Sequence, residues 1–545
     1  MASHGRSATD DGAAPGAVEA LTGFINTNTL LDLAHRFSET YSDLARTSTE
    51  HFLVTPVTAL PTGKERGKFL AIDVGGTNLR VGWIELLSHV DEHSSHGCKD
   101  TDDDKAFAKI KRSHDRDWPI GDHLKMDKAE DLFAWIADCI AEVVKEAITA
   151  GTVPSVSDLP SGEEILLGIT FSFPMAQTSL SEATLLPMGK GFAITTDLNL
   201  GKMLLAGYAR HCSEPGVNGQ HNSDQVHKSR TLAPLPRIRV AAITNDTVAT
   251  FASLAYAVKA APNSRVAMGL IVGTGTNATV PMKLENLHPA KKKDLPNADV
   301  VEMVVINTEW TIRGTDRPLI EMNIKTPWDL TLDANSDAPG FQPFEYMTAG
   351  RYLGEIVRLA YLDEVSPTSN DDVPSSLQTR NALPTRFLSE VVARLELDEV
   401  KKELEQRYPS TSITTYWTSS RVNTIRTIAH AVQQRSSALI AAACVGLLHC
   451  VHDIQLDMTT GAESEARSNG NGASDSSTSE ELVIAYAGGT ISQYPQWLET
   501  CQYWIDKLVH AGSIANASKK VVLQEALDGG IIGAGVLAGM TDNIA

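Results

Sequence analysis

The sequence has few residues of the kinds that build disulfide frameworks, zinc sites or secretory leaders. Its six cysteines are scattered over 545 residues, and no two have CxxC spacing. We therefore expect reduced thiols in a reducing compartment. The N-terminal segment contains no apolar run, so no signal peptide is expected.

Positive charge is scarce as well. The chain has 47 lysines and arginines against 67 aspartates and glutamates, which gives a formal net charge of -20. Binding to nucleic acid or to an anionic membrane surface requires positive charge on the protein. We therefore expect no direct nucleic-acid binding, although the composition leaves room for a local basic patch.

Long hydrophobic runs are missing too, with one exception at residues 437–454. This run has about the length of a membrane span, but it carries His449, His452 and Asp453 near one end. A transmembrane helix and a buried core helix both fit the pattern, and the polar end favours the core helix. We therefore expect no membrane span.

The chain does contain enough apolar side chains for more than one core. Hydrophobic residues make up 42% and charged residues 21%, a balance typical of soluble, folded proteins. A chain of 545 residues exceeds the length at which single cores stop growing, so we expect at least two domains.

Polar stretches and helical periodicity divide the chain. Residues 1–16 are interpreted as a disordered tail. Four polar segments are interpreted as surface insertions, because their composition cannot form a packed core: 90–105, 213–230, 364–383 and 461–481. A helix is predicted over 128–149, where Asp127 and Glu130 form a candidate capping box. Further helices are predicted near 18–47, 198–211, 344–362, 385–405, 421–453 and 495–511.

Three predicted strands end in glycine turns. The turns are Gly75-Gly76 after strand 69–74, Gly273-Thr-Gly275 after 268–272, and Gly488-Gly489 after 482–487; the first two continue as strands. Glycine steps permit tight turns and leave backbone N–H groups open to face an anion. For any one of them taken alone, an ordinary hairpin turn is the favoured interpretation. Their recurrence favours two related α/β domains whose phosphate loops face a shared cleft.

Six segments, in order along the chain, carry a resemblance to a known family. They are IDVGGTNLRV at 72–81, LGITFSFPMAQTSL at 167–180 with KGF at 190–192, TNDTV at 244–248, GTGTN at 273–277, INTEW at 306–310 and PGFQPFE at 339–345. Together they resemble the phosphate-loop, sugar-binding and catalytic segments of the eukaryotic hexokinase family. Within it, the chain resembles the atypical hexokinase-like proteins of filamentous fungi.

The resemblance implies a two-domain α/β fold of the ribonuclease-H/actin type, with a ligand cleft between a small and a large domain. The expected division is a tail at 1–16, an N-terminal helical segment at 17–64, a small domain at 65–245 and a large domain at 246–545. The last helix is expected to return towards the small domain.

The resemblance also implies roles for single residues in phosphorylation of a hexose, glucose above all. Asp246 would be the base that takes the proton of the 6-hydroxyl, whereas an isolated NDT also reads as a turn or a helix N-cap. The residues that would hydrogen-bond the sugar are Ser172, Lys190, Asn245, Asn277, Glu309 and Glu345.

ATP and Mg²⁺ are the implied cofactors. Asp73 would lie near magnesium. The residues implied at the phosphates and nucleotide are Asp73, Gly75, Gly76, Thr77, Asn78, Arg80, Gly273, Thr274, Gly275, Gly488, Gly489 and Thr490. For Arg80 a structural ion pair is the competing interpretation.

Several positions depart from the family's pattern. Met188-Gly189 stands where the family has Trp-Thr, and Thr311-Ile-Arg-Gly314 stands where it has Gly-Ser-Phe-Asp. On the nucleotide side, Ala278 replaces a glycine of the second loop, and Ile531 and Ile532 interrupt a glycine-rich segment near the C-terminus. Bulk at these positions is expected to restrict the backbone close to the nucleotide.

The motifs and the departures together support two hypotheses, with a third behind them. The chain is an ATP-dependent hexose 6-phosphotransferase acting on glucose, fructose or mannose, or it is a catalytically impaired, sugar-binding regulator of the carbon-source response. A kinase for another sugar, such as an N-acetylhexosamine, is the third. The departures predict weak turnover, with the defect on the nucleotide side. A cytoplasmic location is expected; regulatory protein partners and association with the nucleus or the mitochondrial surface stay open.

Overall fold

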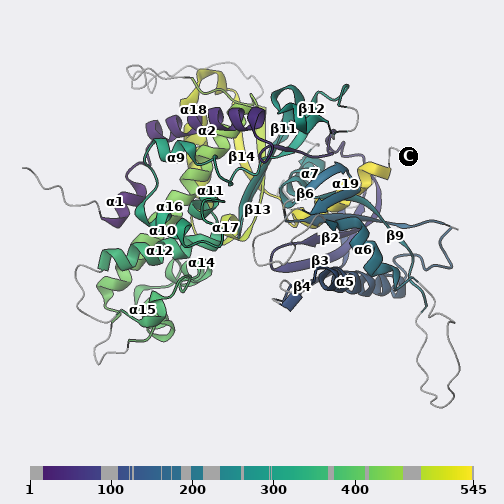
Figure 1. Cartoon of the computed structure of the whole chain (residues 1–545), viewed down its shortest axis with the longest axis horizontal. Coiled ribbons are helices and arrows are strands. Elements are labelled where there is room, and N and C mark those ends of the chain that lie inside the picture. Colours follow the sequence, from purple (N-terminus) through teal and green to yellow (C-terminus); the bar gives the residue numbers. More distant parts are fainter. Residues whose placement is uncertain are drawn as a thin grey trace, which may run out of the picture.

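The structure, a computed structural model, describes residues 16–87, 109–121, 123–124, 128–160, 162–173, 175–185, 198–212, 233–258, 263–293, 295, 298–365, 373–410, 416–457 and 480–542. Two mixed sheets organise these residues (Figure 1). A five-stranded sheet lies on the right of the view with α5 (Ala129–Thr149) and α6 (Leu200–Ala209) beside it, and a six-stranded sheet borders the large group of helices on the left. The expected tail and most of the expected insertions fall outside the described residues.

The five-stranded sheet has the order β4 (Ile110–Pro119), β3 (Asn78–Leu86), β2 (Gly67–Val74), β5 (Ile165–Phe171) and β9 (Ile238–Thr244). The β2–β3 and β3–β4 pairs are antiparallel, whereas β2–β5 and β5–β9 are parallel. Helices α5 (Ala129–Thr149) and α6 (Leu200–Ala209) supply the apolar side chains that bury one face. The N-cap of α5 is Lys128, which makes no side-chain cap bond, whereas Asp127 of the expected capping box lies outside the described residues.

The six-stranded sheet has the order β1 (Leu53–Val54), β12 (Met303–Asn307), β11 (Thr276–Lys283), β10 (Ser264–Val272), β13 (Glu480–Ala487) and β14 (Lys519–Glu525). Its antiparallel β10–β11 hairpin repeats the β2–β3 hairpin of the first sheet. A third, small sheet consists of β6 (Met175–Ser179), β7 (Glu182–Leu185) and β8 (Leu198–Asn199).

Long helices bury one face of the six-stranded sheet. They are α2 (Thr27–Thr47), α12 (Gly350–Val365), α16 (Ser419–Cys450) and α18 (Trp497–Gly512). By length and composition α16 could cross a membrane, but 94% of its most apolar window is buried inside the protein. It is therefore a core helix, as its polar end indicates.

Shorter elements complete the helical part. They are α1 (Ala17–Thr22), α8 (Pro289–Lys292), α9 (Arg317–Glu321), α10 (Pro327–Ala334), α11 (Pro343–Thr348), α13 (Ser375–Gln378), α14 (Thr385–Phe387), α15 (Leu397–Arg407) and α17 (Gly489–Gln493), with 3-10 turns at Leu284–Asn286 and Ile514–Asn516 and a π-helical turn at Leu388–Val392.

The C-terminal helix α19 (Gly529–Asp542) packs between the five-stranded sheet and α7 (Asp246–Val258). Glycines make this close packing feasible. A Cβ on Gly533 would lie 2.0 Å from the carbonyl oxygen of Ala249 in α7, and one on Gly168 of β5 would lie 2.1 Å from that of Ala534. The last helix thus returns to strands formed by residues 67–171, while the domain division at residue 245 stays a prediction.

Gly533→Ala should therefore lower the free energy of unfolding by about 2 kcal/mol, because backbone atoms must move apart to admit the methyl group. Helix propensity alone would make the alanine variant more stable by about 1 kcal/mol, so a loss of stability can be attributed to the close packing. Chemical denaturation measures the change. Gly76→Ala is the control, since a Cβ there meets nothing within 4 Å. Equal stability of G533A and the parent would contradict close packing of α19 on α7.

Candidate functional site

Helix α7 starts at the carboxyl end of β9 and carries the predicted base. Asp246 is its first residue, and its Oδ1 accepts a hydrogen bond from the Thr247 N–H at 2.9 Å. Asn245 caps the helix, since its Oδ1 accepts from the Val248 N–H at 3.0 Å. The N-cap interpretation of this motif thus applies to Asn245, and a contact of Asn245 with a sugar would come from its Nδ2 group.

The first glycine turn joins β2 to β3. The Gly75 N–H donates to the Asn78 carbonyl at 2.9 Å, and Thr77 and Asn78 are exposed at the tip. Ser172 lies beside the end of β2, because its N–H donates to the Val74 carbonyl at 3.0 Å. The turn therefore brings the loop tip and Ser172 to the same edge of the five-stranded sheet.

Asp73, the next-to-last residue of β2, lies in an acidic environment. Burial and then the negative charge of Asp246 raise its pKa to about 7, with smaller contributions from Asp528 and Asp117 and opposition from Arg80. A Cβ on Gly530, at the start of α19, would lie 2.3 Å from Asp73 Oδ2, so α19 presses directly on this carboxylate. The position suits a bound cation, which would offset the excess negative charge.

Asp73→Asn should change the pH dependence of stability in metal-free buffer. A raised pKa means that the folded state binds the proton more tightly, so the free energy of unfolding falls as pH rises from about 4 to 7. Since the ordinary pKa of an aspartate is 3.8, this shift can lower the free energy of unfolding by at most about 4 kcal/mol. We expect D73N to be about 2 kcal/mol more stable than the parent near pH 8 and equally stable near pH 4.

Thermal or chemical unfolding of D73N across this pH range measures the gain. Asp398→Asn, in the first turn of α15, removes an exposed carboxylate and should show no such pH dependence. A constant difference between D73N and the parent at all pH values would contradict a raised pKa of Asp73.

Arg80 is held by two carboxylates. Its Nε lies 3.1 Å from Asp117 Oδ1, and its Nη1 lies 3.1 Å from Asp528 Oδ1. Asp528 also pairs with Arg112 of β4, and it adopts a positive φ of 50° just before α19. The structural ion pair, one of the two interpretations of Arg80, is therefore formed, and it ties the start of α19 to the five-stranded sheet.

The second glycine turn joins β10 to β11 and is fixed from two sides. The Gly273 carbonyl accepts from the Gly350 N–H at 2.8 Å and from the Thr490 hydroxyl at 2.9 Å. The Thr274 carbonyl accepts from the Arg351 N–H at 3.2 Å. Gly488 of the third turn has a φ of 122°, and a Cβ there would lie 2.4 Å from the Val272 carbonyl oxygen at the end of β10. Only glycine therefore fits where the third turn packs against the second.

A chain of amides and carboxylates begins at the end of that turn. Asn277 Nδ2 donates to Asn307 Oδ1 at 2.7 Å, and Asn307 Nδ2 donates to Glu309 Oε1 at 2.8 Å. Glu309 has φ of 47°, a conformation that a non-glycine residue rarely adopts and that is concentrated at functional sites. The geometry fixes the Glu309 carboxylate beside Asn277.

Glu345 joins the same group from α11. It is 3% exposed, and its Oε2 accepts from the Thr276 N–H at 3.2 Å. Since Thr276 precedes Asn277, three of the predicted sugar ligands, Asn277, Glu309 and Glu345, surround one end of β11. A buried carboxylate held by a backbone N–H keeps acceptor capacity for further donors.

One large cavity, with a volume of about 1030 Å³, opens at the second glycine turn, and neither the predicted base nor the predicted sugar ligands are among the residues that line it. Thr77 of the first loop, Gly273 and Thr274 of the second, and Gly489 and Thr490 of the third all line it. Its outer wall carries Arg351, Thr385, Arg386, Ser389 and Arg394. The three predicted phosphate loops thus face one space, which guanidinium and hydroxyl groups and the carboxylates of Glu355 and Glu390 border.

The structure brings the predicted residues into two groups. One group lies at the edge of the five-stranded sheet and consists of Asp73, Ser172, Asn245 and Asp246. The other lies at the end of β11 and consists of Asn277, Glu309 and Glu345. Helix α7 connects the two by packing on β10, where a Cβ on Gly269 would lie only 2.5 Å from the Thr247 carbonyl oxygen. Lys190 and Met188-Gly189 lie outside the described residues. Among the described residues, no group of three or more His, Cys, Asp or Glu side chains is arranged to hold a metal ion.

Sequence reasoning missed several residues. Asn307 lies inside the INTEW segment, where its place at a strand end and its amide side chain were available signals. Arg351, Arg386 and Arg394 come from helix starts and turns far apart in the chain, and no local pattern marks them.

The three side chains that were expected to add bulk near the nucleotide are buried in the core, and a restriction of the backbone there stays a prediction. Ala278 is 0% exposed and points into the core of the six-stranded sheet. Ile531 and Ile532 are 1% and 4% exposed and pack with Phe69 and Ile84 under the five-stranded sheet. None of the three lines the cavity, because strand alternation and the helix face direct them inward.

Comparison with known proteins identifies relatives over most of the chain. A family sequence model described as hexokinase matches residues 267–540, and a second one, also described as hexokinase, matches residues 22–256. Hexokinase-1 of Nicotiana tabacum is 34% identical over 336 residues, which cover 61% of this chain and 56% of the tobacco protein. Hexokinase-5 of Oryza sativa subsp. japonica is 29% identical over 493 residues, 89% of this chain and 80% of the rice protein.

Solved structures show the same architecture. A hexokinase from Schistosoma mansoni, complexed with glucose, superposes with a TM-score of 0.68 at 25% identity, covering 96% of this chain and 98% of that one. Another structure titled as hexokinase has a TM-score of 0.65 at 22% identity, with the same coverage. The two-domain, actin-like α/β fold is therefore the fold of this chain.

Proposed function

Because this chain belongs to the hexokinase family, we propose that it transfers the terminal phosphate of ATP to the 6-hydroxyl group of a hexose, with glucose as the first candidate. The matched stretch spans only 56% of the tobacco relative's length, so the proposal rests on the site of this chain and not on that relative's activity. One observation carries the proposal. Loops from both sheets face a single cavity, and the Asn277–Asn307–Glu309 chain starts at its second loop.

Sugar recognition would fall to the end of β11. The Glu309 and Glu345 carboxylates are acceptors for hydroxyl donors, and the Asn277 amide offers both kinds of group. Their mutual hydrogen bonds fix these side chains before a sugar arrives, which reduces the entropy lost on binding. Ser172, Asn245 and Lys190 remain proposed ligands on the other side of the site.

The chemical step would need one base. As the oxygen of the 6-hydroxyl forms a bond to the terminal phosphorus, Asp246 would accept the hydroxyl proton, and the bond to the leaving ADP would break. Asp246 is suited to this role because the start of α7 fixes its carboxylate through the Thr247 N–H. Asn245 fixes the helix start in turn, so the base has little freedom to turn away.

The cavity fits ATP by its chemistry. Backbone N–H groups at glycine turns and three arginines provide donors for a triphosphate. Magnesium would neutralise charge on the phosphates, and Asp73 is the residue that would hold it. Magnesium at such sites binds through one or two carboxylates and substrate phosphates, so a dedicated cluster of three protein ligands is not required.

The alternative, a catalytically impaired regulator, loses part of its basis. Ala278, Ile531 and Ile532 were part of the argument for an eroded nucleotide site, and their side chains lie in the core. Met188-Gly189, another departure on which this alternative rests, lies outside the described residues. Thr311–Gly314 is accommodated structurally, since Arg313 pairs with Glu50 and Gly314 takes the positive φ of 96°. We therefore favour a working enzyme, in the cytoplasm, over the regulator.

A coupled assay on purified protein tests the proposal. With ATP, magnesium and glucose, fructose or mannose, we expect turnover of about 1–100 per second, the range of many kinases. Calorimetry with glucose alone, which does not depend on catalysis, should show binding. Binding without turnover would establish the regulator instead, and neither binding nor turnover with any of the three sugars would overturn the hexose assignment.

A further inference from the structure

A second, smaller pocket lies next to the nucleotide cavity and has no part in the proposed reaction. Its volume is about 230 Å³, below the range of about 300–1000 Å³ typical of larger ligands. It lies among α10, α12 and the turn after α13, and it shares Arg351, Glu355 and Asn381 with the nucleotide cavity. A ligand here would be small and would touch residues that also border the nucleotide.

The lining is positive in a chain that is strongly negative overall. It contains three arginines, Arg351, Arg358 and Arg380, and two carboxylates, Asp337 and Glu355. Glu355 is fully engaged: it pairs with Arg358 at 2.5 Å and accepts from the Asn381 N–H at 2.7 Å. Within the part of the chain that the structure describes, Arg351 and Arg380 form their ion pairs with Asp337, and Arg351 also lies over the Tyr352 ring, 5.8 Å from its centroid.

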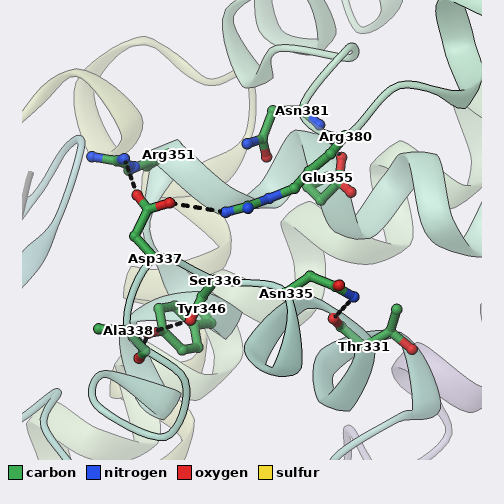
Figure 2. A network of polar contacts seen from close by, with 10 residues as sticks. All are labelled: Thr331, Asn335, Ser336, Asp337, Ala338, Tyr346, Arg351, Glu355, Arg380 and Asn381. Atoms are coloured by element: carbon green, nitrogen blue, oxygen red, sulfur yellow. Dashed lines mark hydrogen bonds and ion pairs between the residues drawn. The ribbon is translucent and has the colours of Figure 1, made fainter. Parts of the chain in front are cut away.

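Asp337 bridges these two arginines, as Figure 2 shows, and the exposure of all three side chains puts them at the mouth of the pocket. Its Oδ2 accepts from Arg351 Nη2 at 3.0 Å, and its Oδ1 accepts from Arg380 Nη2 at 3.2 Å. The Asp337 side chain is 70% exposed, whereas its backbone segment is fixed by the Tyr346 hydroxyl, which donates to the Ala338 carbonyl at 2.8 Å. Ion pairs this exposed contribute little to stability, so a stronger anion could displace the carboxylate.

We propose that Arg351 and Arg380 form a binding site for a small phosphate-class anion, either free phosphate or a small phosphomonoester, and that Asp337 occupies this site until the anion displaces it. Two guanidinium groups on either side of one carboxylate match the oxygens of a phosphate, which carries more charge and more acceptors than Asp337. Glu355 and Arg358 keep the floor of the pocket neutral, so the surplus donors lie at the mouth.

The site is coupled to the nucleotide cavity by Arg351. Its side chain pairs with Asp337, and its N–H donates to the Thr274 carbonyl of the second phosphate loop. Two anionic ligands would then share one arginine, so each is expected to weaken binding of the other, and by the same factor. This coupling rests on the proposed function, whereas the anion site itself does not.

Direct titration of the full chain with inorganic phosphate tests the site without any turnover. We expect Asp337→Asn, which removes the competing carboxylate, to bind phosphate about tenfold more tightly. We expect Arg380→Ala to bind it at least about tenfold more weakly, and Arg380→Lys, which keeps the charge but loses the planar fork, to lie between the parent and R380A. Glycerol 3-phosphate in a parallel titration shows whether an ester is preferred to free phosphate.

Arg386→Ala is the matched control, because Arg386 lines the nucleotide cavity only and its side chain is 82% exposed. Phosphate affinity unchanged in R386A but changed in opposite directions in D337N and R380A supports the proposal. An equal loss in R386A and R380A would place the phosphate in the nucleotide cavity and overturn it. Unchanged affinity in D337N would also overturn it, and since Asp337 is exposed, this variant should fold like the parent.

Discussion

Asp246→Asn should lower kcat for hexose phosphorylation by about a thousandfold and leave the affinity for glucose within about threefold. The amide cannot accept the hydroxyl proton, but it has the same shape and can keep the hydrogen bond from the Thr247 N–H that fixes the start of α7. The expected change is thus confined to the chemical step, because the carboxylates proposed to hold the sugar, Glu309 and Glu345, come from other elements.

Steady-state kinetics and glucose calorimetry on the same preparation give the two quantities. Asp131→Asn, in the first turn of α5, removes a carboxylate from another helix start and should leave kcat unchanged. A loss of less than about tenfold in D246N would exclude Asp246 as the base, since such bases contribute about 100-fold or more. Loss of glucose binding with loss of turnover would make Asp246 a structural residue.

The same variant distinguishes the two hypotheses for this chain. If the parent phosphorylates glucose and D246N does not, the enzyme interpretation holds, and the base is identified. If the parent already turns over as slowly as D246N while both bind glucose, then the site recognises sugar without using its base, as a regulator would.

The two strand–turn–strand hairpins could be predicted because their signals are local. An apolar strand that ends in a glycine step predicts a tight turn, and the β2–β3 and β10–β11 pairs are such hairpins. The third turn has the same local pattern, but Gly489 starts the short helix α17. Whether a strand or a helix comes after a glycine turn depends on which neighbours pair with the first strand, and here β14 takes the place beside β13.

Helices were predicted well where periodicity was long and unbroken. The range 421–453 corresponds to α16 (Ser419–Cys450), and 495–511 corresponds to α18 (Trp497–Gly512). The range 18–47 is two helices, because the chain turns at Gly23 and Asn26 caps α2 through the Thr29 N–H. The range 385–405 is not one helix: α14 continues into the π-helical turn at Leu388–Val392, and residues 393–396 separate that turn from α15.

Side-chain direction was the part of the site that the sequence could not provide. Ala278 comes directly after Asn277, yet Asn277 bonds to Asn307 at the site and Ala278 lies in the core. Adjacent strand residues point to opposite faces of the sheet, so a substitution next to a sugar-binding residue need not face the bound sugar. Only the register of β11 against β10 and β12 decides which face each residue takes.

Removing one partner of the buried ion pair between α10 and α16 should cost about 3–5 kcal/mol of the free energy of unfolding. Arg435 is 0% exposed and donates to both oxygens of Asp329, at 2.8 and 2.7 Å. Asp329, 3% exposed, also accepts from the Thr326 N–H in the capping box of α10. Either single loss leaves a charged group in the core without its counter-ion.

A double-mutant cycle of Arg435→Met, Asp329→Asn and the double variant measures this pair by chemical denaturation. We expect the double variant to lose less than the sum of the single variants, because no uncompensated charge remains. Asp43→Asn is the control: it breaks the pair with Arg317, whose side chains are 49% and 45% exposed, and should cost under about 1 kcal/mol. Additive losses would mean that the two charges act independently, and a small loss in both single variants would mean that water reaches the pair.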